Sequence, residues 1–503
     1  MTADDIREPL RARRIGIHTQ HEAVVFMRTD CHVCRSEGLT PLARVLIESG
    51  GRSAIATLYQ VSGNWLQENE VGLSESSWER LRTEDGATVS VRHPEPVLSL
   101  SEVRSRIYGN RLSKPALRSI IGDIVAGQYS DVDVSAFLTA CATLPLDEEE
   151  TIALTSVMVE VGERIEWDRP IVLDKHCVGG LPGNRTTPIV VSIVAALGLT
   201  MPKTSSRAIT SPAGTADAME TMAPVDLDVA GIRRVVDREG GCIAWGGAVR
   251  LSPADDLLIR VERALDLDSE GQLIASVLSK KIAAGATHLV LDIPVGPTAK
   301  VRSPDAARAL ADRLADVAQE FQIKTAIVLS NGLQPVGRGI GPALEAHDVL
   351  AVLKGERSSP TDLRERACSI AGSLLELCNH AAAGTGAKMA EDCLNDGRAW
   401  TKFQAICEAQ GGMRLPPVAR LKHDILATTD GVVNAIDNRK IAKVAKLAGA
   451  PEAKAAGVFM HVRLGEVIQR GQPLYTIHAE SEGELAYALE YALRNALAVE
   501  VTA

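Results

Sequence analysis

The sequence predicts a multidomain α/β protein, and three observations support this fold class. The 503 residues are 46% hydrophobic, which is enough apolar material for several cores. Short β-favouring runs fill residues 15–100, a helical pattern follows, and from residue 169 apolar runs alternate with helices. We therefore expect an N-terminal β domain, a small all-α domain, a large α/β domain with a mixed or parallel sheet, and a C-terminal α+β domain.

The first two domains are predicted for residues 1–95 and 96–168. In the β domain, "EAVVFMRTD", "RSAIATLYQVSG" and "ATVSVRH" are typical of short strands between polar turns, and a boundary lies near Pro94. In the all-α domain apolar residues recur at helical spacing, and the helix after Asp147 has an acidic first turn. We expect residues 255–283 to return to this domain.

The α/β domain is predicted for residues 169–254 and 284–414. The runs "PIVLDKH", "THLVLDIPVG" and "KTAIVLSNG" are typical of buried strands, with helical patterns between them. In such sheets ligands bind at the carboxyl ends of the strands. The C-terminal α+β domain, residues 415–503, contains "VRLGEVIQRGQPLYTIHA", which resembles half of a lipoyl-type barrel. It has no lysine between methionines in a hairpin turn, so a structural role is expected.

Composition excludes several classes of function. The formal net charge of -10, from 54 basic and 64 acidic residues, disfavours nucleic-acid binding, although a local pocket can still bind a small anion. No apolar run reaches membrane-spanning length, and the N-terminal residues lack an apolar signal core. Nine scattered cysteines are typical of reduced thiols. We expect a cytoplasmic protein with no nucleic-acid or membrane partner.

The segment "DKHCVGGLPGNR" (Asp174–Arg185) precedes the apolar run "PIVVSIVAALGL". Its glycines let several N–H groups point one way, and the following helix start adds partial positive charge. Lys175 adds a full charge, and Thr186 and Thr187 add hydroxyl donors. These features predict a cradle for a small anion such as phosphate. The alternative is an ordinary turn from strand to helix.

A second segment, "PKTSSRAITSPAGTADAMETM" (Pro202–Met222), is dense in hydroxyl groups around one arginine. Arg207 offers a planar fork for an oxyanion or a base carbonyl. The hydroxyl donors are Ser205, Ser206, Thr210, Ser211 and Thr215. The alternative is a Ser/Thr-rich surface loop.

A third segment, "DLDSEGQLIASVLSKKIAAG", places Ser276 and Lys280 four residues apart on one helical face, with Asp268 just ahead of the helix. Taken alone, this pattern also fits a solvated amphipathic helix.

Together the three segments resemble the thymidine phosphorylase and AMP phosphorylase family. "KHCVGG" is similar to the family's phosphate loop, "SSRAITSPAGTADAMETM" to its signature segment and "ASVLSKK" to its substrate helix. The likeness continues through "SNGLQPVGRGIGPALEA" and runs from Ser101 to the C-terminus. With its N-terminal β domain, the chain resembles the longer thymidine phosphorylase-like subfamily.

This resemblance implies a pentosyltransferase that catalyses reversible phosphorolysis of a nucleoside. Inorganic phosphate, a co-substrate, displaces the base from C1′ of the sugar, and no cofactor or metal is implied. The resemblance also implies a homodimer formed through the α domain, with a closing cleft between the α and α/β domains. Breaking the N-glycosidic bond develops positive charge on the sugar and negative charge on the base, so an anion and a donor stabilise the transition state.

Site residues follow from the resemblance position by position. The phosphate would be held by Lys175, Ser205 and Thr215. The nucleoside would contact Gly180, Ser206, Arg207, Ala208, Ile209, Thr210, Ser211, Ser276 and Lys300. The catalytic candidates are His176, Lys280 and Asp268. As a proton donor, Asp268 would need a pKa raised by burial or by a neighbouring carboxylate.

Two features depart from the family pattern. Cys177 stands where the family loop usually has serine, and a thiol donates hydrogen bonds weakly, so one phosphate contact is in doubt. Cys31 and Cys34 have the spacing of a metal knuckle, but no second pair lies nearby in the sequence, so zinc is the less favoured interpretation.

Three functions are compatible with these patterns. The first is thymidine or pyrimidine nucleoside phosphorolysis, giving thymine and 2-deoxyribose 1-phosphate from thymidine. The second is phosphorolysis of AMP or another nucleoside 5′-monophosphate, in which Lys300 and the Thr210–Ser211 region would bind the 5′-phosphate. The third is a non-catalytic nucleotide-binding or anthranilate phosphoribosyltransferase-like protein, which would require acidic metal ligands for pyrophosphate. The first is preferred.

Overall fold

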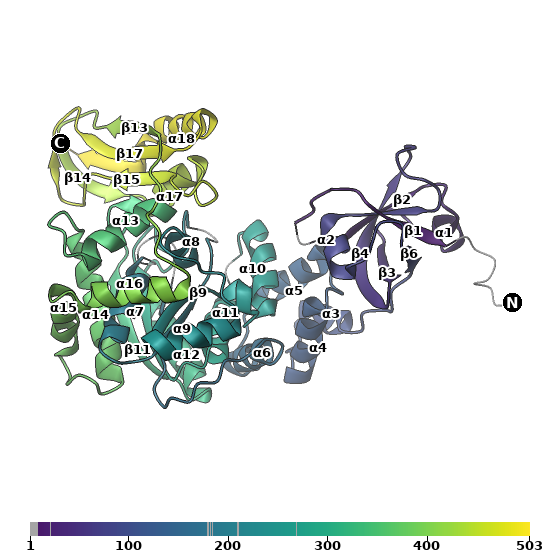
Figure 1. Cartoon of the computed structure of the whole chain (residues 1–503), viewed down its shortest axis with the longest axis horizontal. Coiled ribbons are helices and arrows are strands. Elements are labelled where there is room, and N and C mark those ends of the chain that lie inside the picture. Colours follow the sequence, from purple (N-terminus) through teal and green to yellow (C-terminus); the bar gives the residue numbers. More distant parts are fainter. Residues whose placement is uncertain are drawn as a thin grey trace. The chain divides into compact units, whose positions relative to one another are not determined.

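A computed structural model describes residues 9–20, 22–178, 181, 183, 185–208, 211–267 and 269–502, apart from the side chain of Ala496. The chain forms two compact units (Figure 1). One comprises Met1–Ser105 and Gly122–Val134, and the other Arg106–Ile121 and Ser135–Ala503. This division is coarser than the four predicted domains, so their boundaries stay predictions.

A closed six-stranded barrel forms the first unit, with strand order β1-β5-β2-β4-β3-β6. Strand β1 closes it by pairing in parallel with β5 and antiparallel with β6. Alternate residues of β3, including Val45 and Ile47, point into the core, because successive side chains of a strand face opposite sides. The elements are β1 (Leu10–Arg14), β2 (Val24–Arg28), α1 (His32–Ser36), β3 (Arg44–Ser49), β4 (Arg52–Val61), β5 (Glu70–Leu73), α2 (Glu75–Leu81) and β6 (Thr88–Arg92).

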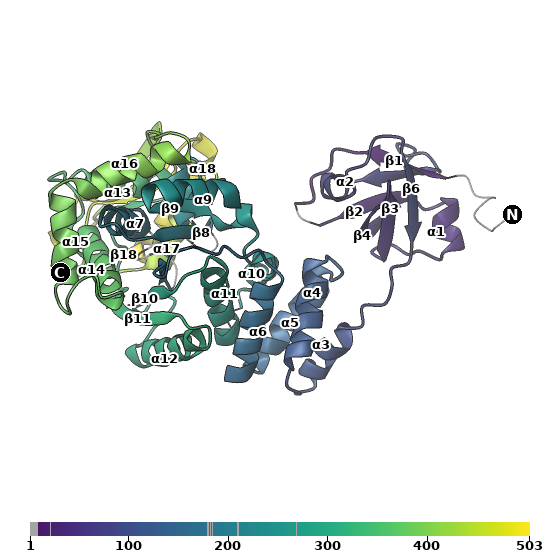
Figure 2. The same cartoon turned by 60° about the horizontal axis from the view of Figure 1, so that its bottom comes forward.

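Helices follow the barrel: α3 (Leu100–Ile107), α4 (Lys114–Val125), α5 (Asp131–Thr143) and α6 (Glu148–Glu160). A capping box starts α6, in which Asp147 accepts from the Glu150 amide and Glu150 accepts from the Asp147 amide. Two helices from later in the chain, α10 (Pro253–Leu265) and α11 (Glu270–Ala283), pack against α6 (Figure 2). This packing holds α11, which carries Ser276 and Lys280.

The α/β region is built on parallel strands. Strands β7 (Leu173–Cys177), β10 (His288–Val295) and β11 (Lys324–Asn331) form one sheet in the order β11-β10-β7. Strands β8 (Met201–Ser205) and β9 (Gly241–Trp245) pair in parallel, and the Leu173 amide donates to the Thr200 carbonyl 2.8 Å away. The carboxyl ends of β7 and β8 therefore lead into the two polar segments predicted to bind the ligand.

Apolar helices cover these strands. Helix α7 (Thr186–Ala196) is buried along nearly its whole length and packs with α14 (Thr361–Leu377) and α16 (Arg398–Gln410) in the largest core. A second core lies between α11, α12 (Pro304–Glu320) and β10. The remaining helices are α8 (Thr215–Glu220), α9 (Val229–Glu239), α13 (Pro342–Leu353) and α15 (Gly386–Asn395).

The C-terminal region contains two antiparallel sheets and two helices. One sheet has the order β12-β15-β17-β13 and the other β16-β14-β18. The two-residue strand β12 (Gly339–Ile340) comes from the preceding α/β segment and pairs with β15. The other elements are β13 (Leu421–Leu426), β14 (Gly431–Ile436), α17 (Asn438–Leu447), β15 (Gly457–Met460), β16 (Val467–Ile468), β17 (Pro473–Ala479), α18 (Glu482–Arg494) and β18 (Val499–Thr502).

The architecture confirms the predicted fold class, a multidomain α/β protein with an N-terminal β barrel, helices, parallel strands and a C-terminal α+β region. Within the described ranges, no helix is long and apolar enough to cross a membrane.

The buried ion pair between Arg106 and Glu150 offers a test of the helical packing. The side chains are 1% and 3% exposed, 2.7 Å apart, and Glu150 also accepts from the Leu112 amide. Glu150→Ala should lower the free energy of unfolding in urea by about 3–5 kcal/mol, since it strands a buried guanidinium. Glu160→Ala, which removes exposed ion pairs with Lys114 and Arg118, should cost about 1 kcal/mol or less. Equal losses would contradict the burial of the first pair.

Candidate active site

Three segments of the site lie against one another: strand β7, strand β8 and helix α11. A buried carboxylate joins them. Asp174 on β7 lies 3.0 Å from Lys203 Nζ on β8 and 2.9 Å from Lys281 Nζ on α11. The structure thus brings together the segments that the sequence singled out separately.

Lys175 is buried, and its ammonium donates to the Thr186 hydroxyl 2.8 Å away. Thr186 in turn donates to the Gly183 carbonyl, also at 2.8 Å. Burial lowers the pKa of Lys175, because a charged group is poorly solvated there. An anion beside the ammonium would reverse this effect, so the predicted role in phosphate binding is chemically reasonable.

His176 is partly exposed beside this lysine. Burial and four surrounding lysines, among them Lys280 and Lys281, keep the pKa of His176 well below its ordinary value. The imidazole is therefore neutral at pH 7. A neutral imidazole can donate one hydrogen bond but carries no extra proton to transfer.

Ser205 ends strand β8 and is 8% exposed. Within the part of the chain that the structure describes, its hydroxyl has no hydrogen-bond partner. A buried polar group without a partner costs free energy unless a ligand or water satisfies it. The unsatisfied hydroxyl of Ser205 therefore favours a ligand site at this position.

The segment after Ser205 is closed by one carboxylate. Asp217 on α8 accepts from the Ala208 amide at 2.6 Å and from the Gly214 amide at 2.9 Å. Thr215 and Ser211 are buried, whereas Ser206 is exposed. Asp217 thus ties Ala208 and Gly214 to the start of α8.

The guanidinium group of Arg207 is bound by other side chains of the protein. It donates to both oxygens of Glu220 at 2.8 Å, and it lies over the Trp245 ring, 4.7 Å from the centroid. The pKa of Arg207 is raised by its hydrogen bonds to Glu220. In this arrangement the arginine anchors the loop, and the predicted contact with substrate remains a prediction.

Ser276 and Lys280 are partly exposed positions on α11, most of which is buried. The Lys280 ammonium forms an ion pair with Asp255 on α10. Burial is the largest single influence and lowers the pKa of Lys280, but Asp255, Asp256 and Glu262 together raise it above its ordinary value. Lys280 therefore stays charged at pH 7 and can interact with a carbonyl or an anionic base.

The structure says less about the remaining predicted residues. Lys300 is exposed in the segment between β10 and α12. The predicted residues Gly180, Ile209, Thr210 and Asp268 lie outside the described residues.

Cys177, the departure from the family pattern, is buried next to Asp292 of β10. Burial and this carboxylate raise the pKa of Cys177 to about 12, so the thiol stays protonated. Arg366 donates to Asp292 through Nε and Nη2, at 2.8 to 3.1 Å. A Cβ at Gly183 would lie 3.1 Å from the Cys177 sulfur and 3.2 Å from an Asp292 oxygen. The loop thus packs directly on this buried charge pair.

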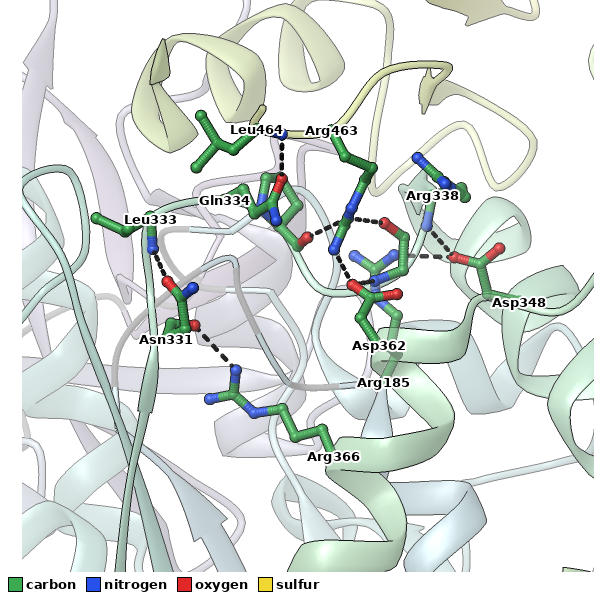
Figure 3. Close-up of polar contacts among 12 residues, drawn as sticks. Arg185, Asn331, Leu333, Gln334, Arg338, Asp348, Asp362, Arg366, Arg463 and Leu464 are labelled. Carbon is green, nitrogen blue, oxygen red and sulfur yellow. Dashed lines mark hydrogen bonds and ion pairs between the residues drawn. The ribbon is translucent and has the colours of Figure 1, made fainter. Parts of the chain in front are cut away.

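Arg185 and Arg463 make further polar contacts close to the start of α7 (Figure 3). Arg185, which precedes α7, is fully buried and lies 3.3 Å from Asp348 of α13. Asp348 also accepts from the Arg338 and Gly339 amides at 2.7 and 2.8 Å. Arg463 of the C-terminal region donates to the Pro335 and Gly337 carbonyls. These contacts connect the C-terminal region, through residues 335–339 and Asp348, to Arg185 just ahead of α7.

Sequence reasoning missed Asp174, Lys203 and Lys281, the residues that join the three segments. Each of the three is next to a short sequence that contains a predicted residue: "KH", "TSS" or "SK". Their positions beside these sequences could have drawn attention to them. Cys31 and Cys34 are both buried. Across the described residues, no group of three or more His, Cys, Asp or Glu side chains could hold a metal ion.

Comparisons with protein families match three parts of the chain. Residues 169–400 match "Glycosyl transferase family, a/b domain", and residues 103–162 match "Glycosyl transferase family, helical bundle domain". Residues 432–499 match "Pyrimidine nucleoside phosphorylase C-terminal domain".

Two relatives are each named "Putative thymidine phosphorylase". The protein of Chelativorans sp. (strain BNC1) is 62% identical over 495 residues, covering 98% of this chain and 97% of the relative. That of Sphingopyxis alaskensis is 62% identical over 484 residues, covering 96% and 94%. The crystal structure of anthranilate phosphoribosyltransferase from Thermus thermophilus is 20% identical with a TM-score of 0.50, and the match covers 61% of this chain and 98% of that chain. This last likeness concerns the fold alone.

A lysine substitution tests the anion site. Lys175→Met should raise the dissociation constant of inorganic phosphate by about 10- to 100-fold, because a hydrogen bond to a charged group contributes about 1.5–3 kcal/mol. Isothermal titration calorimetry measures this constant. Lys388→Met, which removes an exposed lysine paired with Asp392, is the matched control. Equal phosphate affinity in wild type and Lys175→Met would show that the anion binds elsewhere.

Proposed function

Because this chain belongs to the family of thymidine phosphorylase-like glycosyl transferases, we propose that it cleaves thymidine with inorganic phosphate. The products are thymine and 2-deoxyribose 1-phosphate. The observation that carries this proposal is the near-full-length identity of 62% to relatives named for this activity. The buried ammonium of Lys175 and the unsatisfied hydroxyl of Ser205 support the phosphate site.

In the proposed mechanism, an oxygen of phosphate attacks C1′ of the sugar as the bond from C1′ to the base breaks. The electron pair of that bond leaves with the base, and the sugar passes through a state with oxocarbenium character. Lys175 and Ser205 hold the phosphate beneath the ring. The phosphate then serves both as the nucleophile and as the negative charge that stabilises the sugar.

The leaving base is stabilised by donors above the sugar. Lys280 donates from a charged ammonium, and the neutral imidazole of His176 donates through its N–H. Ser276 lies on the same helix and fixes the orientation of the base. Exclusion of water from the closed site would favour attack by phosphate over hydrolysis.

The proposal also covers the cofactors, the oligomeric state and the cellular compartment of the enzyme. The enzyme needs no cofactor or metal besides the co-substrate phosphate, and it acts as a homodimer in the cytoplasm. Nine free cysteines, all buried, support a reducing compartment. Nucleoside and phosphate are its ligands, and neither nucleic acid nor a membrane surface is expected as a partner.

A panel of substrates tests this function. The protein is incubated with thymidine, uridine, AMP or CMP, with and without inorganic phosphate, and the released base is measured by chromatography. We expect thymine from thymidine only when phosphate is present, and a large loss of turnover in Lys175→Met. Base release from nucleotides alone would identify a nucleoside monophosphate phosphorylase instead. Base release without phosphate would contradict phosphorolysis.

A further inference from the structure

The Asp174 carboxylate is a buried charge that ion pairs hold at the site. It is 1% exposed, and one oxygen accepts from the Lys175 amide at 2.7 Å. The same oxygen lies 3.0 Å from Lys203 Nζ, and the other oxygen lies 2.9 Å from Lys281 Nζ. A single side chain of β7 thus contacts two other segments of the chain, β8 and α11.

Each contact leads directly to a residue of the proposed reaction. Lys175 follows Asp174 on β7. Lys203 lies two residues before Ser205 on β8 and also donates to the Thr204 carbonyl at 2.8 Å. Lys281 follows Lys280 on α11. The cluster therefore joins the strand that carries Lys175, the strand that carries Ser205 and the helix that carries Lys280.

The charges of the cluster are unbalanced. Two lysines share one carboxylate, and all three side chains are nearly or fully buried. Burial is the main cause that lowers the pKa of Lys281 to about 7, with Lys203 acting in the same direction and Asp174 opposing both. The groups facing Lys281 are Asp174 and His176 from β7 and Lys203 from β8. An anion bound nearby would balance the excess positive charge.

Resting on the proposed function, we propose that Asp174, Lys203 and Lys281 form a positioning cluster that couples the phosphate site to the base-binding helix. The cluster touches neither substrate. It fixes the positions of β7, β8 and α11 relative to one another. Lys175, Ser205 and Lys280 can then bind one nucleoside and one phosphate at the same time. Loss of the link between Asp174 and Lys281 releases α11 from β7 and misplaces both ligands relative to each other.

Lys281→Met is the central variant, because it removes the ammonium and keeps an apolar side chain of similar length. We expect kcat/KM to fall about 10- to 100-fold for phosphate and by a similar factor for thymidine, since a misplacement of about 1 Å can cost this much. Lys281→Arg, which keeps the positive charge, should recover most of the loss. Lys388→Met, an exposed lysine paired with Asp392, should behave as wild type.

A double-mutant cycle separates coupling from a merely structural role. If Lys281 acts through Asp174, the variant Asp174→Asn/Lys281→Met should lose no more activity than the worse single variant. Independent contributions would instead multiply. Should Asp174→Asn fail to fold, Lys281→Met and Lys281→Arg still decide the question, with thermal melting showing that each is folded.

The pH profile provides a readout that packing alone would not change. Burial lowers the pKa of both Lys175 and Lys281, so in wild type kcat/KM should fall above neutral pH as these lysines lose their protons; in Lys281→Arg the part of this fall that is due to Lys281 should move to higher pH. Normal activity of Lys281→Met, multiplying losses in the double variant, or an unmoved profile in Lys281→Arg would each overturn the proposal. Absence of phosphorolysis in wild type would instead contradict the proposed function.

Discussion

The structure of the site depends on one constraint: the carboxylate of Asp174 is buried and must be paired. Removing a carboxylate from water costs several kcal/mol, and good geometry with cations is needed to offset this cost. The ammonium groups of Lys203 and Lys281 supply it at 3.0 and 2.9 Å. Because these lysines come from β8 and α11, pairing the carboxylate also decides where those elements lie relative to β7.

The same arrangement gives the site its electrostatic character. Buried lysines outnumber the carboxylates they face, so the site favours an anion and keeps His176 neutral. The charged residues around this lysine cluster are instead arginines paired with carboxylates. There Arg366 pairs with Asp292, and Arg185 pairs with both Asp348 and Glu345, so each arginine faces at least one carboxylate. Excess positive charge is thereby confined to the place where phosphate is proposed to bind.

Much of this could be predicted from the sequence. Alternating apolar runs and helical patterns predicted the fold class, and residues such as Lys175 and Ser205 stood out because glycines or hydroxyl groups surround them. Asp174 did not stand out, since a charge at a strand end is usually solvated and only the fold reveals its burial. The ion pair of Arg207 with Glu220 was equally hidden, because thirteen residues separate the partners. Strand β12 is too short to leave a periodic pattern.

The central claim is that one inorganic phosphate sits where β7 and β8 end. A crystal structure with bound phosphate tests it most directly. The account predicts an anion within about 2.7–3.2 Å of both Lys175 Nζ and Ser205 Oγ. Phosphate bound at another place, or Lys175 and Ser205 without an anion in a crystal saturated with phosphate, would contradict it.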